Sequence, residues 1–90
     1  MINTKIMIIN KLGLHARAAA KFVSAASAFK NCQIRAGVNG RLIDAKSIMA
    51  VMMLAASKGT ELELQFDGDD EQAARDAVVT LINNRFDEAE

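Results

Sequence analysis

Several residue types on which whole classes of proteins depend are scarce or missing in this chain. It has no proline, no tryptophan, no tyrosine and a single cysteine. The lone Cys32 cannot form an internal disulfide, and the N-terminus has no secretory signal, so we expect a cytoplasmic location. Without Trp or Tyr to stack on bases, and with a formal net charge of zero, the chain is not typical of a nucleic-acid-binding module.

Long apolar segments are also missing. The longest covers residues 48–56, far short of the roughly 20 residues needed to span a bilayer, so we expect no membrane insertion. The 90 residues suffice for one compact domain, which we expect to span residues 1–90. Its core must be thin, which argues against a deep active site and against a domain that senses small molecules.

Charge is distributed unevenly along the chain. All but two of the eleven Lys and Arg residues lie within residues 1–60, where Asp44 is the only acid, and the other ten acids follow residue 60. A basic surface on the first part would favour an anionic group or an acidic protein, whereas an acidic C-terminal helix would repel nucleic acid. The plainer interpretation is a solvated pattern of charges, and both remain open at this point.

The hydrophobic pattern predicts seven elements in the order βαββαβα. Strands are expected at residues 5–9, 32–38, 41–43 and 61–66, the middle two joined by the turn dipeptide Asn39-Gly40. Helices are expected at residues 16–28, after Ser47 as N-cap, and after the turn at residues 67–70. The predicted fold class is α+β, a mainly antiparallel four-stranded sheet with three helices on one face. The expected core residues are Ile6, Ile8, Leu14, Phe22, Val23, Ile34, Leu42, Leu62, Leu64, Phe66, Val78, Leu81 and Ile82.

His15 is the only histidine, and it stands where a loop containing Gly13 becomes an Ala-rich helix. Free backbone N–H groups and the helix dipole make a helix N-terminus an anion site, and this field favours the neutral, nucleophilic imidazole. Arg17, in the first turn, offers a fork of donors that matches phosphate oxygens. These residues alone leave two interpretations open: phosphate chemistry, or a surface His that simply begins a helix. One His and one Cys supply too few ligands for zinc, and we expect no metal and no cofactor.

Two motifs resemble those of a known family. Gly13-Leu14-His15-Ala16-Arg17 resembles the phosphorylation-site motif of HPr, the histidine-containing phosphocarrier of the bacterial phosphoenolpyruvate:sugar phosphotransferase system. Residues 45–49, Ala-Lys-Ser-Ile-Met, are similar to that family's second motif, around its regulatory serine. The resemblance covers essentially the whole chain and implies an HPr-like open-faced β-sandwich. Two motifs at the family's separation are much more specific than either motif alone.

The resemblance implies a carrier function. Enzyme I would phosphorylate His15 on Nδ1, and the group would pass to an enzyme IIA domain. Arg17 would assist transfer, while the backbone N–H groups of Ala16, Arg17 and Ala18 would hold the phosphate oxygens. The chain would then be a covalent carrier without turnover of its own, not an enzyme, and we expect a monomer. Sugar-transport and nitrogen-regulatory branches of the family use the same chemistry and both remain possible.

One position departs from the family pattern, because Ala18 stands where proline usually follows the arginine. Alanine loosens the helix start by about 0.4–1 kcal/mol and restores one N–H, so we expect a modest kinetic effect. Ser47 matches the serine that HPr kinase/phosphorylase modifies in part of the family, which would block docking of Enzyme I. The expected partner-binding residues are Ala16, Ala20, Lys21, Ile48, Met49 and Met52.

Overall fold

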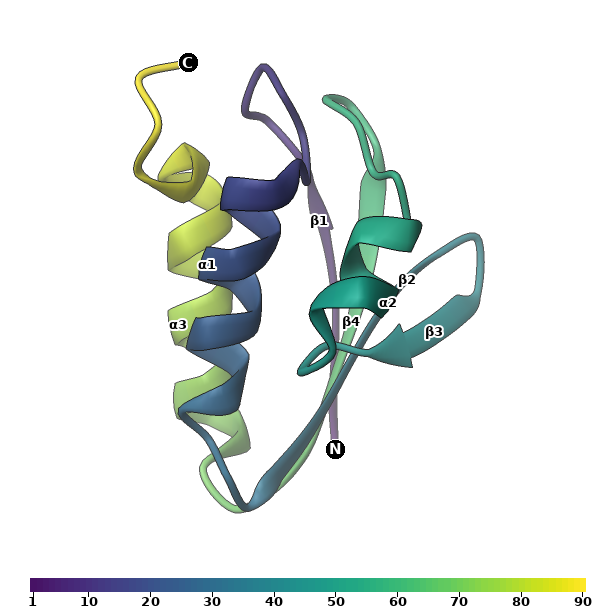
Figure 1. Ribbon diagram of the computed structural model, residues 1–90. Coiled ribbons are helices and arrows are strands. Elements are labelled where there is room, and N and C mark those ends of the chain that lie inside the picture. Colours follow the sequence, from purple (N-terminus) through teal and green to yellow (C-terminus); the bar gives the residue numbers. More distant parts are fainter.

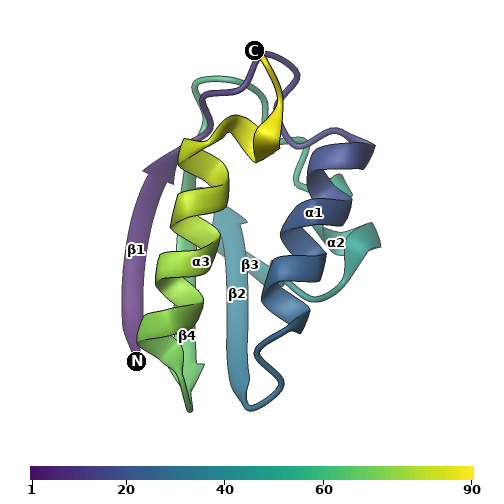
Figure 2. The same cartoon turned by 90° about the vertical axis from the view of Figure 1, so that its left-hand side faces the viewer.

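Four strands form one sheet, and helices cover one of its faces (Figures 1 and 2). The computed structural model describes all residues 1–90. Its elements are β1 (Ile2–Met7), α1 (Ala16–Ser27), β2 (Cys32–Val38), β3 (Arg41–Asp44), α2 (Ile48–Met53), β4 (Glu61–Gly68), α3 (Glu71–Asn83) and the short 3₁₀ turn η1 (Arg85–Asp87). The strand order is β1-β4-β2-β3, and every neighbouring pair is antiparallel. The predicted fold class is confirmed.

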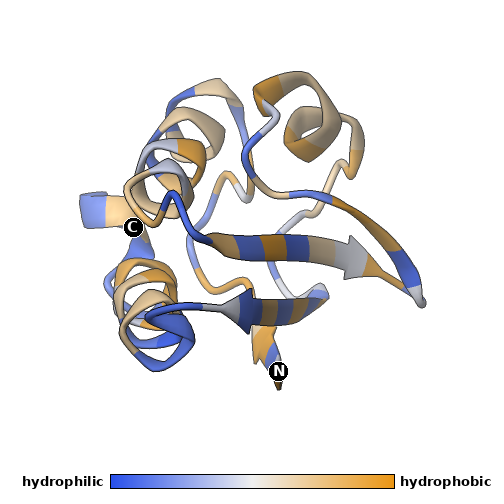
Figure 3. Ribbon diagram, turned by 90° about the horizontal axis from the view of Figure 1, so that it is seen from below, coloured by the Kyte–Doolittle hydropathy of each residue, from blue (hydrophilic) through white to orange (hydrophobic).

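Successive side chains of each strand point alternately to the helix-covered face and to the open face of the sheet. Figure 3 shows this as alternating hydrophobic and hydrophilic bands along the strands. In β4, Leu62, Leu64 and Phe66 are buried, while the residues between them are less covered. This is the period-2 pattern read from residues 61–66. The strand extends beyond that prediction, to Gly68, because β2 pairs along it as far as Cys32, opposite Gly68. On the other side of β4, β1 pairs from Met7, opposite Glu61, to Ile2, opposite Phe66. Accordingly β1 occupies residues 2–7 rather than the expected 5–9.

The hairpin between β2 and β3 has the turn that the sequence predicts. Asn39 and Gly40 both adopt positive φ angles, 56° and 81°, and Val38 pairs with Arg41 across the turn. Two consecutive left-handed residues are the requirement of a tight hairpin turn, which Asn-Gly meets at low cost. This hairpin sets the register of β3, the edge strand of the sheet.

The register of β3 corrects one predicted core residue. Leu42 is only half-buried and lies on the open face of the sheet, near Lys5 and Glu63, whereas its neighbour Ile43 packs against the core. Adjacent strand residues face opposite sides, so a strand contributes one of the two and never both. Ile6, Val23 and Leu81 are also half-buried, at the margin of the core. The other nine predicted core residues are buried.

Helices α1 and α3 lie side by side over the sheet, and α2 packs against α1 and β3 (Figure 2). Beyond α3 the chain turns back through η1, where Phe86 is completely buried against the helices. The sequence pattern did not predict this last core residue. No helix of the structure is both long enough and apolar enough to cross a membrane.

Candidate functional site

His15 is the N-cap residue of α1, with extended backbone angles, and the loop before it fixes that position. Gly13 has φ +65°, and a Cβ built there would lie 2.5 Å from the carbonyl oxygen of Ala56. The next amide, that of Leu14, donates to the same carbonyl at 2.8 Å. Only glycine fits so close to the neighbouring loop in this conformation. The glycine of the motif therefore determines where the imidazole stands.

Asn10 is a buried polar residue that organises the same loop. Its Nδ2 donates to the carbonyl of Gly13 at 2.8 Å and to Oε1 of Glu88 at 3.0 Å. It thus joins the loop before His15 to the C-terminal segment. Sequence reasoning missed this residue, and the available signal was weak: an asparagine between apolar strand residues and a glycine-containing turn.

The imidazole of His15 contacts a carboxylate that is 73 positions away in the chain. Nε2 of His15 pairs with Oε2 of Glu88, and Nδ1 makes no hydrogen bond within the protein. The His15 side chain is 28% exposed, so the ring is accessible on one side and covered on the other. The hydrogen bond from Asn10, more than that from His15, lowers the pKa of Glu88 below its usual range, although partial burial opposes the shift.

The start of α1 offers unused hydrogen-bond donors next to the ring. The first amide of the helix with a backbone partner is that of Ala19, which donates to the carbonyl of His15 at 2.8 Å. The N–H groups of Ala16, Arg17 and Ala18 therefore have no acceptor in the protein, and the helix dipole adds partial positive charge there. Arg17 is exposed and forms no salt bridge. Ala16 and Arg17 line the same shallow hollow as His15.

Lys21 also borders this hollow, but its ammonium group is occupied. Nζ donates to the carbonyl of Phe86 at 2.7 Å, and the side chain is half-buried. Lys21 is therefore less exposed than a docking residue would be, and its role in partner binding stays a prediction. Its position one turn beyond Arg17 makes it a link to the C-terminal segment, because it supplies a donor to a backbone carbonyl there.

Most of the expected contact residues are exposed on α1 and α2, which pack against each other. Ala16 and Ala20 are exposed on α1, and Ile48, Met49 and Met52 are 40%, 69% and 41% exposed. Met53, at 80%, and Leu12, at 66%, are further exposed apolar residues that were not predicted. Exposed apolar side chains of this kind are typical of a transient protein contact.

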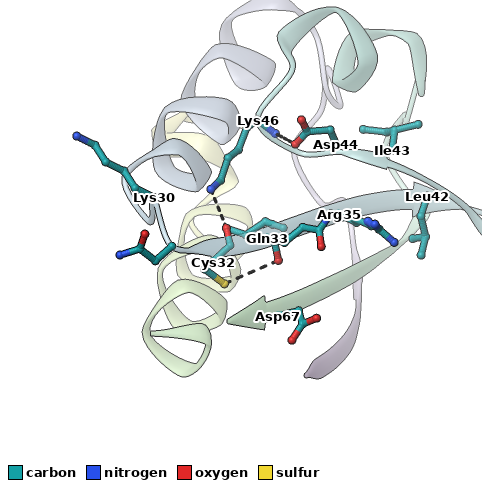
Figure 4. A pocket seen from close by; sticks show the side chains of 11 residues that line it. Lys30, Cys32, Gln33, Arg35, Leu42, Ile43, Asp44, Lys46 and Asp67 are labelled. Carbon is teal, nitrogen blue, oxygen red and sulfur yellow. Dashed lines mark hydrogen bonds between the residues drawn. The ribbon is translucent and has the colours of Figure 1, made fainter. Parts of the chain in front are cut away.

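Ser47 caps α2 as predicted, because its hydroxyl accepts a hydrogen bond from the amide of Ala50 at 3.4 Å. Its neighbours in the second motif also have structural roles. Ala45 is buried, and Nζ of Lys46 donates to the carbonyls of Phe29 and Cys32, both at 2.7 Å. Figure 4 shows Lys46 reaching across from the loop before α2 to β2. These contacts fix the loop that presents Ser47.

The comparisons with known proteins agree with this geometry. Residues 2–84 match the family model described as the PTS HPr component phosphorylation site. The chain is 62% identical over 87 residues, 96% of both chains, to the phosphocarrier protein HPr of Pseudomonas aeruginosa. It also superimposes on an HPr crystal structure from Thermoanaerobacter tengcongensis with a TM-score of 0.94 and 44% identity, covering 100% of both chains. A structure described as an HPr dimer from that organism matches with a TM-score of 0.77 and 45% identity, covering 98% of this chain and 100% of that one. The chain therefore belongs to the HPr family, the phosphocarrier proteins of the phosphotransferase system.

Proposed function

We propose that this chain accepts a phosphoryl group on Nδ1 of His15 from phosphorylated Enzyme I and transfers it to an enzyme IIA domain. The supporting observation is the conjunction at the start of α1: a partly exposed imidazole with an unengaged Nδ1, three N–H groups without acceptors, and the unpaired guanidinium of Arg17. A phosphoryl group on Nδ1 would lie against donors that are already oriented. Ala18 in place of the usual proline supplies one of these N–H groups.

The direct test is the intact mass of the chain after incubation with Enzyme I, magnesium and phosphoenolpyruvate. An acid-labile gain of one phosphoryl group in wild type, absent in His15→Ala, is the expected result. Arg17→Ala should still be phosphorylated, but at a reduced rate, because it loses a charged donor to the transferring group. No gain in wild type with an Enzyme I that phosphorylates another HPr would refute the proposal.

The identity of the acceptor is tested in the second step, the transfer of the phosphoryl group from His15 to an enzyme IIA domain. Phosphorylated chain is mixed with an enzyme IIA of the sugar-transport branch or with one of the nitrogen-regulatory branch, and loss of the group from His15 is timed. We propose the sugar-transport branch, in agreement with the family model and the names of the relatives. Faster transfer to the nitrogen-regulatory domain would assign the chain to that branch instead.

A second modification is proposed at Ser47, by an HPr kinase/phosphorylase. The residue is half-buried at the first turn of α2, beside the exposed Ile48 and Met49. A phosphate there adds nearly two negative charges at a helix N-terminus, which the helix tolerates, so the effect is repulsion at the docking surface. Ser47→Asp should slow phosphorylation of His15 without lowering the melting temperature, and an unchanged rate would refute the inhibitory role.

The carrier is proposed to act in the cytoplasm as a monomer without turnover of its own. One copy contains every residue of the site described above, and the membrane finding is compatible with free diffusion between partners. Light scattering of the phosphorylated and unphosphorylated chain tests the monomer, since a dimer is described for a relative. A stable dimer at working concentration would overturn this part of the proposal.

A further inference from the structure

The C-terminal segment, residues 85–90, is held in a defined conformation by specific contacts. Arg85, Phe86 and Asp87 all have left-handed backbone angles, with φ of 56°, 54° and 61°. Residues other than glycine disfavour this conformation because of their Cβ atom. Three consecutive residues hold it only when the surroundings compensate. Here Phe86 is fully buried, its carbonyl accepts from Lys21, and the carbonyl of Glu90 accepts from the amide of Lys11 at 2.6 Å.

This bend brings Glu88 to the imidazole, and both of its oxygens are engaged. Oε1 accepts a hydrogen bond from Asn10, and Oε2 pairs with Nε2 of His15. Asn10 in turn holds the carbonyl of Gly13, two residues before the histidine. The buried side-chain amide of Asn10 therefore holds one oxygen of the carboxylate, and the other oxygen faces the imidazole. The Glu88 side chain is only 14% exposed, so water competes little for these contacts.

The chemistry of this pair determines which ring nitrogen carries the proton. An ionised carboxylate can only accept hydrogen bonds, so Nε2 must be the donor. A neutral imidazole with its hydrogen on Nε2 has its free lone pair on Nδ1. The lowered pKa of Glu88 keeps this carboxyl ionised at neutral pH. The pair thus selects the tautomer in which Nδ1 is nucleophilic.

We propose that Glu88 is a positioning residue for phosphoryl transfer, which holds His15 in the Nε2–H tautomer and stabilises the ring as it gains positive charge. The proposal rests on the function proposed above. In the transfer step the lone pair of Nδ1 forms the new bond to phosphorus, and the bond from phosphorus to the donor breaks with its electron pair staying on the donor. The proton on Nε2 does not leave. Its hydrogen bond to the Glu88 carboxylate strengthens as the phosphorylated ring becomes cationic.

The first readout requires no partner protein. In 15N-edited NMR spectra of the full chain, the two ring nitrogens of His15 report the tautomer ratio directly. Wild type should show predominantly Nε2–H, and Glu88→Gln should show a mixture. The matched control is Glu90→Gln, which removes a carboxylate from the same segment, where it makes only an exposed ion pair with Lys11. Backbone amide spectra of both variants check that the fold is retained.

The second readout is the second-order rate of phosphorylation by Enzyme I. Glu88→Gln should lower it by about tenfold, the lower end for losing a hydrogen bond to a charged group, while Glu90→Gln leaves it unchanged. A wild-type tautomer ratio in Glu88→Gln overturns the proposal, and so does an altered ratio with an unaltered rate. Absence of phosphorylation in wild type overturns the carrier function alone, because the tautomer readout needs no Enzyme I.

Discussion

Truncation of Phe86 to alanine should release the C-terminal segment and destabilise the whole domain. The ring is fully buried and contacts the region between α1 and α3. Removing a buried Phe side chain costs about 3–5 kcal/mol of unfolding free energy. Relaxation of the left-handed residues 85–87 offsets part of this cost, so we expect a loss of about 3 kcal/mol. For a domain of this size that lowers the melting temperature by about 12–24 °C.

The assay is urea unfolding followed by circular dichroism, with the tautomer ratio of His15 measured in parallel. Phe86→Leu is the matched control, since it keeps an apolar side chain of similar volume and should cost less than about 1.5 kcal/mol. The alanine variant should also lose the contact between Glu88 and His15, while the leucine variant keeps it. A loss below about 1 kcal/mol for Phe86→Ala would refute the view that this residue anchors the segment.

Three further predictions concern the loop, the second helix and pH. Gly13→Ala should lower the unfolding free energy by at least about 2 kcal/mol, because it combines a left-handed alanine with a close contact to Ala56; an unchanged urea midpoint would contradict this. Ser47→Ala should cost about 1 kcal/mol through the lost cap, whereas Ser47→Asn should cost less, and equal losses would argue against capping. The folded-state pKa of Glu88 is lowered, so its contribution to stability is present above the unfolded pKa, near 4.5, and is lost as pH falls through the lower folded value. The difference in unfolding free energy between wild type and Glu88→Gln should be present at about pH 5 and shrink as the pH falls below 4.5; a difference that grows below pH 4.5 would contradict the assignment.

The fold could be predicted because its signals are local. Residues 61–66 alternate with period 2, Asn39-Gly40 requires a specific hairpin turn, and Ser47 precedes an apolar helix. Each of these is determined by neighbours within a few positions. The ends of the strands and the face on which Leu42 lies were harder to predict from the sequence. Both are decided by pairing with another strand, and a shift of one residue exchanges the two faces.

Half of the site could be predicted in the same way, and half could not. His15, Arg17 and the helix start are adjacent in sequence, so their proximity follows from the helix alone. Glu88 reaches the imidazole only through tertiary structure, across 73 positions of chain, and it is held there by Asn10, from which it is separated by 78 positions. Nothing in the local pattern of residues 85–90 indicates a left-handed turn, because it is the burial of Phe86 that compensates for its strain.

The strand order has a consequence for how the protein is made. The central strand β4 pairs with both β1 and β2, so the N-terminal strand has no partner until residues 61–68 have left the ribosome. Pairings this distant in sequence must overcome the entropy of closing the intervening chain before they stabilise anything. His15 is synthesised early, yet its carboxylate partner Glu88 follows 73 positions later in the chain. A nascent chain therefore carries the histidine long before it carries the group that orients it, and the site is complete only once synthesis has passed Glu88.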